Sequence, residues 1–354
     1  MNIMDSAMRE VFHWEYNPFS FKILPDIFVG YSSEVDTLVT GIRNGDKFAF
    51  LMGPTGSGKT TLLQHISTRF PEWKVIYLPK PPKDPRDWTA VFSDFTKPSF
   101  LDVLFRRKDG TNLYNIHQKI NERLGGKKCL LFVDECHEAT QESLEWLRTI
   151  TDQVTNLSVV LAGLPIFENI LKSNLETFLR RITLKVDLGC LSPVETREFI
   201  KRRIESTGGE DIKPFTSSVV EHIYKKTGGF PREVLRLCNE LFQKALEKNL
   251  TTVDTDFLNE LDLPAGASKE TLEYLPPRQK LIIDVLAKEG ELTPTEMVKK
   301  LHAKGEYKDE ENAIRSVNNL VRRLLSDGLV ERKRIGKSYK YKISPRYQPL
   351  LVSA

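Results

Sequence analysis

The sequence predicts an α/β fold in which a three-layer domain around a parallel sheet is followed by a helical lid and a C-terminal winged helix-turn-helix. Three observations predict this fold. A glycine-rich motif over residues 53–60 joins an apolar, strand-like run to a helical pattern. A second apolar run, residues 129–133, ends in two adjacent acids. Residues 276–354 hold 17 Lys and Arg against 10 Asp and Glu, a net charge of +7, whereas residues 1–275 carry −3.

The motif over residues 53–60 is a phosphate-binding loop (P-loop). Its pattern, G-x-x-x-x-G-K-[ST], lies between a strand and a helix, which is the context that such a loop requires. Its glycines let backbone N–H groups turn towards a phosphate at a helix N-terminus. Lys59 can reach the β- and γ-phosphates, and the Thr60 hydroxyl can ligate Mg²⁺. We therefore expect a bound nucleoside triphosphate, surrounded by Gly53, Pro54, Thr55, Gly56, Ser57, Gly58, Lys59, Thr60 and Thr61.

The apolar run Cys129–Val133 predicts a buried parallel strand, which Asp134 and Glu135 follow directly. Because ligands of open α/β sheets bind at the carboxyl ends of the strands, both acids belong beside the P-loop. We expect Asp134 to hold the Mg²⁺ shell, and Glu135 to orient and polarise the attacking water. These residues also begin a D-E-x-H box like that of superfamily 2 helicases. However, the next strand ends in Ala162-Gly163 instead of S-A-T, and no Q-x-x-G-R-x-x-R stretch follows.

Other strands and helices complete this domain. The strand that ends near Gly163 and Leu164 offers no polar side chain where switch-type ATPases often place one against the γ-phosphate. The expected strands are 47–52, 74–78, 129–133, 157–161 and 182–186, and the expected helices are 34–42, 61–70, 99–107 and 112–124.

Two basic segments each leave two interpretations open. Residues 79–98 contain five prolines among their basic side chains, which excludes continuous regular structure. This segment is either a surface loop or a loop that grips DNA or a neighbouring subunit. Arg180 and Arg181 precede the last strand. They form either a salt-bridged helix end or an arginine finger for a neighbour's site, a contribution of about 10³-fold or more in rate.

Residues 188–262 are predicted to form helices. Ser192 is a good N-cap, with Pro193 at the first helical position and Glu195 placed for a capping box. Arg232 lies in the first turn of a later helix, where a cation opposes the local dipole. We therefore expect Arg232 to have an anionic partner, for which the γ-phosphate is the candidate. The expected lid helices are 193–206, 215–226, 231–248 and 253–260.

Residues 276–354 follow a predicted linker and have the pattern of a winged helix-turn-helix. Helices are expected at 277–288, 294–303 and 309–326, before two short strands. Asn and Arg side chains can read bases in a major groove, while wing cations mostly hold phosphates. A winged helix that contacts only protein is the alternative, which the charge of the wing opposes. The candidate DNA-binding residues are Arg315, Asn318, Asn319, Arg322, Arg323, Arg332, Lys333, Arg334, Lys337 and Lys340.

Composition limits the other possibilities. No apolar run approaches the ~18 residues that a membrane span needs, and the first residues lack the pattern of a secretion signal. We therefore expect a cytoplasmic protein with no membrane partner. The four cysteines are scattered without a C-x-x-C pair, so neither a zinc site nor a disulfide framework is indicated.

Together these signatures resemble the AAA+ ATPases over nearly the whole chain. The arm from Asn17-Pro18-Phe19 to Gly30, residues 134–139 and residues 161–165 are similar to the general secretion pathway A-type and transposition-ATPase branch. Residues 229–232 look like the sensor 2 motif, and Arg180 or Arg181 falls where the arginine finger sits. The lid and winged helix are similar instead to archaeal origin-recognition initiators. The resemblance implies ATP rather than GTP, and DNA binding. Leu164 departs from the polar residue usual in the first branch, which implies slow hydrolysis.

The predicted function is therefore an ATP-dependent DNA-binding switch of the replication-initiation or remodelling kind. It would be a slow ATPase that uses ATP and Mg²⁺, binds double-stranded DNA, and works as a homo-oligomer or beside a neighbouring ATPase subunit. The alternatives are an assembly or signalling ATPase whose winged helix binds protein, and a nucleotide-holding scaffold that hardly turns over. The expected parts are an arm at 1–30 that packs on the nucleotide domain, the nucleotide-binding domain at 31–187, the lid at 188–262, the linker at 263–275 and the winged helix at 276–354.

Overall fold

The computed structural model describes residues 14–96, 111–261, 275–302, 310–326, 329–335 and 338–344, together with residues 8, 11, 12, 272, 347 and 351. The chain divides into two compact units. The first, called the sheet unit, comprises Tyr31–Gly53 and Lys59–Leu188; the second, called the helical unit, comprises Met1–Gly30, Pro54–Gly58 and Gly189–Ala354. The helix expected at 99–107, most of the linker expected at 263–275, and Lys337 lie outside the described residues.

The sheet unit is built on five parallel strands in the order β2-β3-β4-β1-β5. The three central strands are buried at every position, as their continuous apolar runs predict for a sheet covered on both faces. Strand β4 continues to Gly163, two residues beyond the expected end. The strands are β1 (Phe48–Met52), β2 (Lys74–Leu78), β3 (Cys129–Val133), β4 (Leu157–Gly163) and β5 (Ile182–Asp187).

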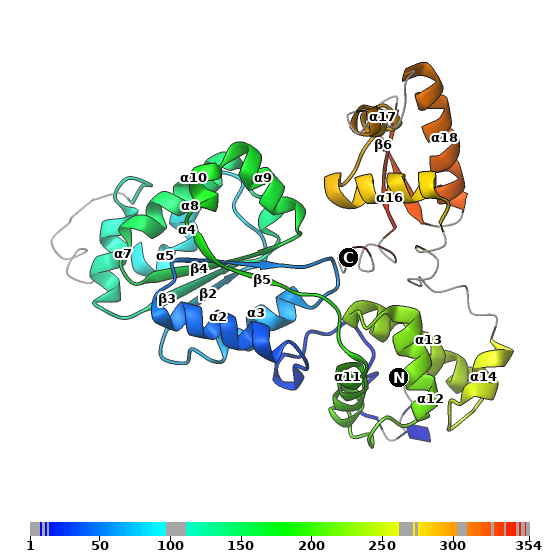
Figure 1. Cartoon of the computed structure of the whole chain (residues 1–354). Coiled ribbons are helices and arrows are strands. Elements are labelled where there is room, and N and C mark those ends of the chain that lie inside the picture. The colour runs from blue at the N-terminus through cyan, green and yellow to red at the C-terminus, as the bar shows by residue number, and fades with distance from the viewer. Residues whose placement is uncertain are drawn as a thin grey trace. The chain divides into compact units, whose positions relative to one another are not determined.

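Helices cover both faces of this sheet, which gives the three layers that the sequence predicts. In Figure 1, α2 and α3 lie on one face, and α8, α9 and α10 lie on the other. Edge-to-face ring pairs join β1 to the second helical layer, Phe48 with Phe178 and Phe50 with Phe167. The elements are α2 (Ser32–Asn44), α3 (Lys59–Ser67), η2 (Pro85–Asp87), α4 (Trp88–Val91), α5 (Ser93–Thr96), α7 (Ile116–Leu124), η3 (Cys136–Glu138), α8 (Gln141–Gln153), α9 (Ile166–Asn174) and α10 (Glu176–Leu179).

In the helical unit, the lid consists of four helices with the expected start. Ser192 and Glu195 exchange the two hydrogen bonds of a capping box, because each side chain accepts from the other residue's backbone N–H. The helices are α11 (Pro193–Glu205), α12 (Ser217–Thr227), α13 (Pro231–Glu247) and α14 (Thr255–Glu260). Among the described residues of the arm, Pro25–Ile27 form a short 3-10 turn, η1.

The arm is part of the apolar core of the lid, and the expectation that it packs on the nucleotide domain was wrong. Trp14 and Phe19 are each 1% exposed and pack with Phe242 of α13. The buried guanidinium of Arg203, on α11, donates hydrogen bonds to the carbonyls of Ser20 and Lys22. An aromatic-rich segment without a period predicts burial, but it does not say which surface buries it.

The last part of the helical unit contains helices followed by a two-stranded hairpin, in the order expected for a winged helix-turn-helix. Three helices precede an antiparallel hairpin, and Leu292, just before the second helix, forms an isolated bridge with Tyr341 of the hairpin. The elements are α16 (Pro277–Glu289), α17 (Pro294–His302), α18 (Glu310–Ser326), β6 (Val330–Ile335) and β7 (Ser338–Ile343). Among the described residues, no helix is both long enough and apolar enough to cross a bilayer.

Candidate functional site

The P-loop begins where β1 ends, and α3 begins at its lysine. Gly53 donates its backbone N–H to the carbonyl of Gly163, at the end of β4. Gly56 and Gly58 have φ angles of +86° and +96°, which L side chains rarely adopt, so glycine is needed at both positions. Lys59 is only 6% exposed, and its ammonium donates to the Gly53 carbonyl at 2.9 Å. The loop is therefore closed on itself, with its cation held at the first glycine.

Asp134 lies directly beyond β3, beside the first turn of α3. Its side chain is 2% exposed, and its backbone N–H donates to the carbonyl of Leu78 at the end of β2. The carboxylate oxygen Oδ2 accepts hydrogen bonds from Thr60 Oγ1 at 2.5 Å and from Tyr77 Oη at 3.1 Å. The other oxygen, Oδ1, accepts from the backbone N–H of Glu135 at 2.9 Å. The structure thus brings together the two residues expected to hold the metal.

These oxygen groups fit a Mg²⁺ ion that binds together with a nucleotide. Mg²⁺ prefers oxygen ligands and is usually bound by one or two carboxylates together with substrate phosphates and water. Thr60 and Asp134 supply a hydroxyl and a buried carboxylate, and both are already in contact. In the part of the chain that the structure describes, no cluster of three or more His, Cys, Asp or Glu could hold a metal alone. With a bound nucleotide, phosphate oxygens and water would supply further ligands.

Glu135 occupies a left-handed backbone conformation, with φ +50°. Its carboxylate lies 3.5 Å from Nδ1 of His137 and is 42% exposed, so it faces water more than Asp134 does. Burial is the main cause that lowers the pKa of His137, which keeps the imidazole neutral at pH 7. The arrangement leaves a carboxylate that can accept a proton from water at the carboxyl edge of the sheet.

The packing around Gly163 explains why the end of β4 carries no polar side chain at this position. A Cβ atom added to Gly163 would lie 2.6 Å from Sγ of Cys136, which is fully buried. Burial also raises the pKa of the Cys136 thiol well above its usual value, so the thiol is neutral and packs like an apolar group. The thiol therefore occupies the space into which a side chain at residue 163 would have to extend.

The two candidate arginine positions differ in their surroundings. Arg232, in the first turn of α13, donates its backbone N–H to the carbonyl of Gly56 at 3.3 Å, and its side chain is exposed. Arg180 pairs with Glu176 at 2.7 Å, and Arg181 pairs with Asp152 at 3.3 Å; all four side chains are at least partly exposed. The structure thus places Arg232 beside the P-loop, and it gives both members of the other pair an acidic partner within their own chain.

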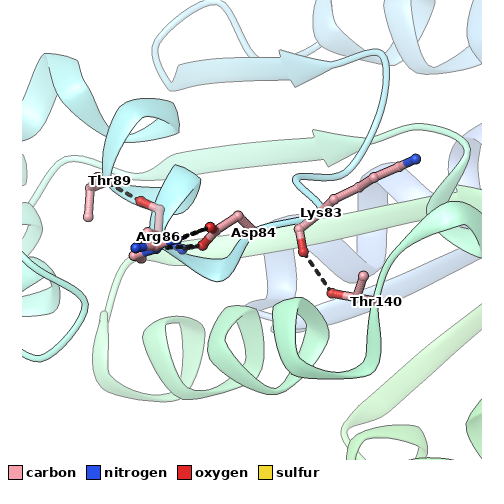
Figure 2. Close-up of polar contacts among 5 residues, drawn as sticks. All are labelled: Lys83, Asp84, Arg86, Thr89 and Thr140. Carbon is pink, nitrogen blue, oxygen red and sulfur yellow. Dashed lines mark hydrogen bonds and ion pairs between the residues drawn. The ribbon is translucent and has the colours of Figure 1, made fainter.

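The loop after β2 is fastened to the segment that follows β3. Figure 2 shows Asp84 accepting from Arg86, and Thr140 donating its hydroxyl to the Lys83 carbonyl at 3.0 Å. The Arg86 side chain holds the pKa of Asp84 low, at about 2, so this pair is ionised at neutral pH. The Lys83 ammonium extends away from these contacts. The charge of Arg86 is therefore balanced within the loop.

The candidate DNA-binding residues form two exposed groups. On α18, Arg315, Asn319, Arg322 and Arg323 are exposed, whereas Asn318 is half-buried and donates its amide to the Ile314 carbonyl at 2.9 Å. On the hairpin, Arg332, Lys333 and Arg334 are exposed on β6, and Lys340 is half-buried on β7. The Arg332 guanidinium stacks 4.8 Å from the ring centre of Tyr339. The side chains expected to read bases thus follow one helix, while the cations expected to hold phosphates follow the hairpin.

Sequence reasoning missed Tyr77, which contacts the carboxylate of Asp134, the expected metal ligand. The run Lys74–Leu78, to which this tyrosine belongs, has the composition of an ordinary core strand, so nothing marks the tyrosine as functional. The signal that could have found it is the position of its hydroxyl near the carboxyl end of a strand, but using that signal requires knowing that β2 is the neighbour of β3.

Comparisons with known proteins agree with the fold described above. Residues 42–171 match the family model described as an AAA domain. The chain is 23% identical to an uncharacterized HTH-type transcriptional regulator of Methanocaldococcus jannaschii, over 96% of this chain and 92% of that protein. It is 28% identical to general secretion pathway protein A of Aeromonas hydrophila over 62% of this chain, but that match spans only 42% of the relative. The ORC2 protein of Aeropyrum pernix, solved as ADPNP–ADP complexes, has a similar fold, with a TM-score of 0.54 and 15% identity over 95% of both chains.

Proposed function

We propose that this protein, whose residues 42–171 match the family model of an AAA domain, is an ATP-dependent switch that binds double-stranded DNA. The observation that carries the proposal is the hydrogen bond between Asp134 and Thr60, the residue that follows the P-loop lysine. The P-loop amides and Lys59 would bind the β- and γ-phosphates. Thr60 and Asp134 would hold Mg²⁺, which neutralises phosphate charge when bound.

Hydrolysis would depend on Glu135. Its exposed carboxylate would orient the attacking water and accept its proton. Arg232, beside Gly56 of the P-loop, would interact with the γ-phosphate, which would make the lid respond to the state of the nucleotide. Because Gly163 leaves the end of β4 without a polar side chain, one group that could position this water is missing. We therefore expect slow turnover.

Binding of DNA is supported by the charge and shape of the winged helix. The exposed Arg and Asn side chains of α18 would enter a major groove, and the cations of β6 would contact phosphates. The fold is similar to that of ORC2, whose structures contain ADPNP and ADP, and the Methanocaldococcus relative is described as an HTH-type regulator. Both descriptions fit a nucleotide-controlled DNA-binding protein.

A neighbouring subunit would complete the active site. Arg180 and Arg181 are exposed, so either could exchange its acidic partner for the γ-phosphate of a second copy. In that arrangement, turnover per subunit rises with protein concentration. It also falls when the arginine that acts as the finger is replaced by Ala.

The test is ATP hydrolysis by the purified protein, with and without duplex DNA, across a range of protein concentrations. We expect turnover to rise with both. Lys59→Ala should abolish ATP binding, whereas Glu135→Gln should bind ATP but lose turnover by about 10²-fold or more, a typical contribution of a general base. Normal hydrolysis by Glu135→Gln would show that another group activates the water. DNA affinity that does not fall with salt would argue against phosphate contacts.

A second candidate is a nucleotide-holding scaffold that hardly turns over. The observation in its favour is the packing of Cys136 against Gly163, which excludes a polar side chain from the end of β4. This function predicts tight ATP binding without phosphate release, even when duplex DNA is present. If DNA affinity is also absent, the winged helix would instead contact protein, as in an assembly ATPase.

A further inference from the structure

Among the described residues, three groups donate hydrogen bonds to the Asp134 carboxylate: the Thr60 hydroxyl, the Tyr77 hydroxyl and the backbone N–H of Glu135. Thr60 belongs to the P-loop and Glu135 to the segment after β3, whereas Tyr77 belongs to neither. It comes from β2, where it is paired in register with Phe132 of the adjacent strand β3. Asp134 lies two residues beyond Phe132, and the Tyr77 hydroxyl reaches its Oδ2 at 3.1 Å. The phenol thus extends from β2 to a buried carboxylate at the end of the neighbouring strand β3. This contact is specific, because a shorter side chain at residue 77 could not make it.

The hydrogen bonds of Asp134 divide its two oxygens between different supports. Oδ1 is fixed by the backbone N–H of Glu135, and Oδ2 is shared by the hydroxyls of Thr60 and Tyr77. Thr60 is itself an expected metal ligand, so its position depends on whether the metal is bound. Tyr77 is half-buried on a strand of the sheet and is not an expected ligand. It is therefore the support of Oδ2 that does not depend on the metal.

We propose that Tyr77 is a positioning residue that holds the Asp134 carboxylate in the orientation in which it binds Mg²⁺ with the nucleotide. The inference rests on the proposed function, because it concerns the same site. Groups that hydrogen-bond to metal ligands commonly contribute 10- to 100-fold to metal affinity, because they fix the orientation of those ligands. Tyr77 therefore raises the affinity for Mg²⁺, and this role is separate from the proposed activation of water by Glu135.

The substitution Tyr77→Phe tests the proposal, because it removes the hydroxyl and keeps the ring. The full-length protein is mixed with a fluorescent N-methylanthraniloyl derivative of ATP, and Mg²⁺ is titrated from EDTA-treated buffer. We expect the Mg²⁺ concentration at half-maximal binding to rise about 10-fold or more. Affinity for the same nucleotide in EDTA should stay within about two-fold of the wild type, since Lys59 and the P-loop amides are unchanged.

Two controls separate positioning from a loss of structure. Tyr16→Phe removes another partly buried tyrosine hydroxyl, which donates to the Ser206 carbonyl at 3.4 Å in the helical unit, and should leave the Mg²⁺ titration unchanged. In an Asp134→Asn background, Tyr77→Phe should add no further effect, because Tyr77 acts through that carboxylate.

The outcomes distinguish this inference from the function on which it rests. If wild-type protein binds no nucleotide at any Mg²⁺ concentration, the proposed function fails and the role of Tyr77 fails with it. If the wild type binds nucleotide with Mg²⁺ and Tyr77→Phe gives the same titration, only the positioning role is overturned. A lower melting temperature with an unchanged Mg²⁺ midpoint would assign Tyr77 a purely structural role and would also overturn the proposal.

Discussion

Replacing Arg203 by Met should loosen the N-terminal arm from the lid. Arg203 is 5% exposed, and its guanidinium donates to the carbonyls of Lys22 at 2.9 Å and Ser20 at 3.1 Å. Burial lowers the pKa of this guanidinium to about 10, so it remains charged at neutral pH. Met keeps much of the apolar stem but supplies no donor, which leaves two carbonyls of the arm without their partner.

The size of the effect follows from these contacts. A hydrogen bond to a charged group contributes about 1.5–3 kcal/mol, so two of them contribute about 3 kcal/mol at the lower value. A third contact, to the Pro18 carbonyl at 3.5 Å, is too long to add much. Removing a buried charge relieves part of its desolvation cost, which acts in the opposite direction. We therefore expect a net loss of about 2 kcal/mol in the free energy of unfolding.

Urea unfolding at pH 7 measures this loss, and trypsin cleavage after the exposed Lys22 reports on the arm itself. The urea midpoint should fall by roughly 1 M, given a denaturant dependence of about 2 kcal/mol per M. Cleavage after Lys22 should become faster in the variant. The matched control is Arg197→Met on the same helix, which removes an exposed pair with Asp211 and should cost less than about 1 kcal/mol. Equal midpoints for the two variants, or unchanged cleavage after Lys22, would refute the reasoning.

Two further substitutions test the P-loop and the response to acid. Gly56→Ala places a Cβ atom 2.7 Å from that of Arg232, on a backbone with φ +86°, and should weaken nucleotide binding about 10-fold or more. The control is Gly45→Ala, where the backbone is also left-handed but the space around the new Cβ is open, and it should leave nucleotide binding unchanged. Fluorescent-nucleotide titration compares the two. Burial lowers the pKa of His222, and the neighbouring lysines of α12 lower it further. As pH falls through about 6.5, the unfolded protein therefore binds more protons at this histidine than the folded protein does, and the stability of the fold declines. His222→Gln should reduce the loss of urea midpoint between about pH 7.5 and 5.5; an identical loss would contradict this assignment.

The sequence was most informative where chemistry is local. The P-loop, the strand before Asp134 and the capping box at Ser192 each depend on residues a few positions apart, and the structure has all three. The contact between Thr60 and Asp134 could also be anticipated, because parallel strands bring their carboxyl ends to one edge.

Features that depend on distant partners could not be predicted in the same way. The aromatic arm had an unmistakable tendency to be buried, but its partner, Phe242, is set by the packing of the lid. Tyr77 has the same difficulty, since its contact with Asp134 depends on the order of strands in the sheet. The glycine at residue 163 suggested a missing polar group, whereas its physical cause, the thiol of Cys136, lies on another segment.

The position of the arm in the core of the lid has a consequence for how the chain is synthesised. Asn17 donates its amide to the side-chain oxygen of Asn239 at 2.7 Å, although the two are 222 residues apart in the sequence. At ~5–20 residues per second, the ribosome makes the second residue roughly 10–45 s after the first. The arm therefore leaves the ribosome before Phe242, the partner of Trp14 and Phe19, has been made, and the whole sheet unit is synthesised in between. A fusion or truncation at this end would therefore alter a core that can form only after the sheet unit has been synthesised.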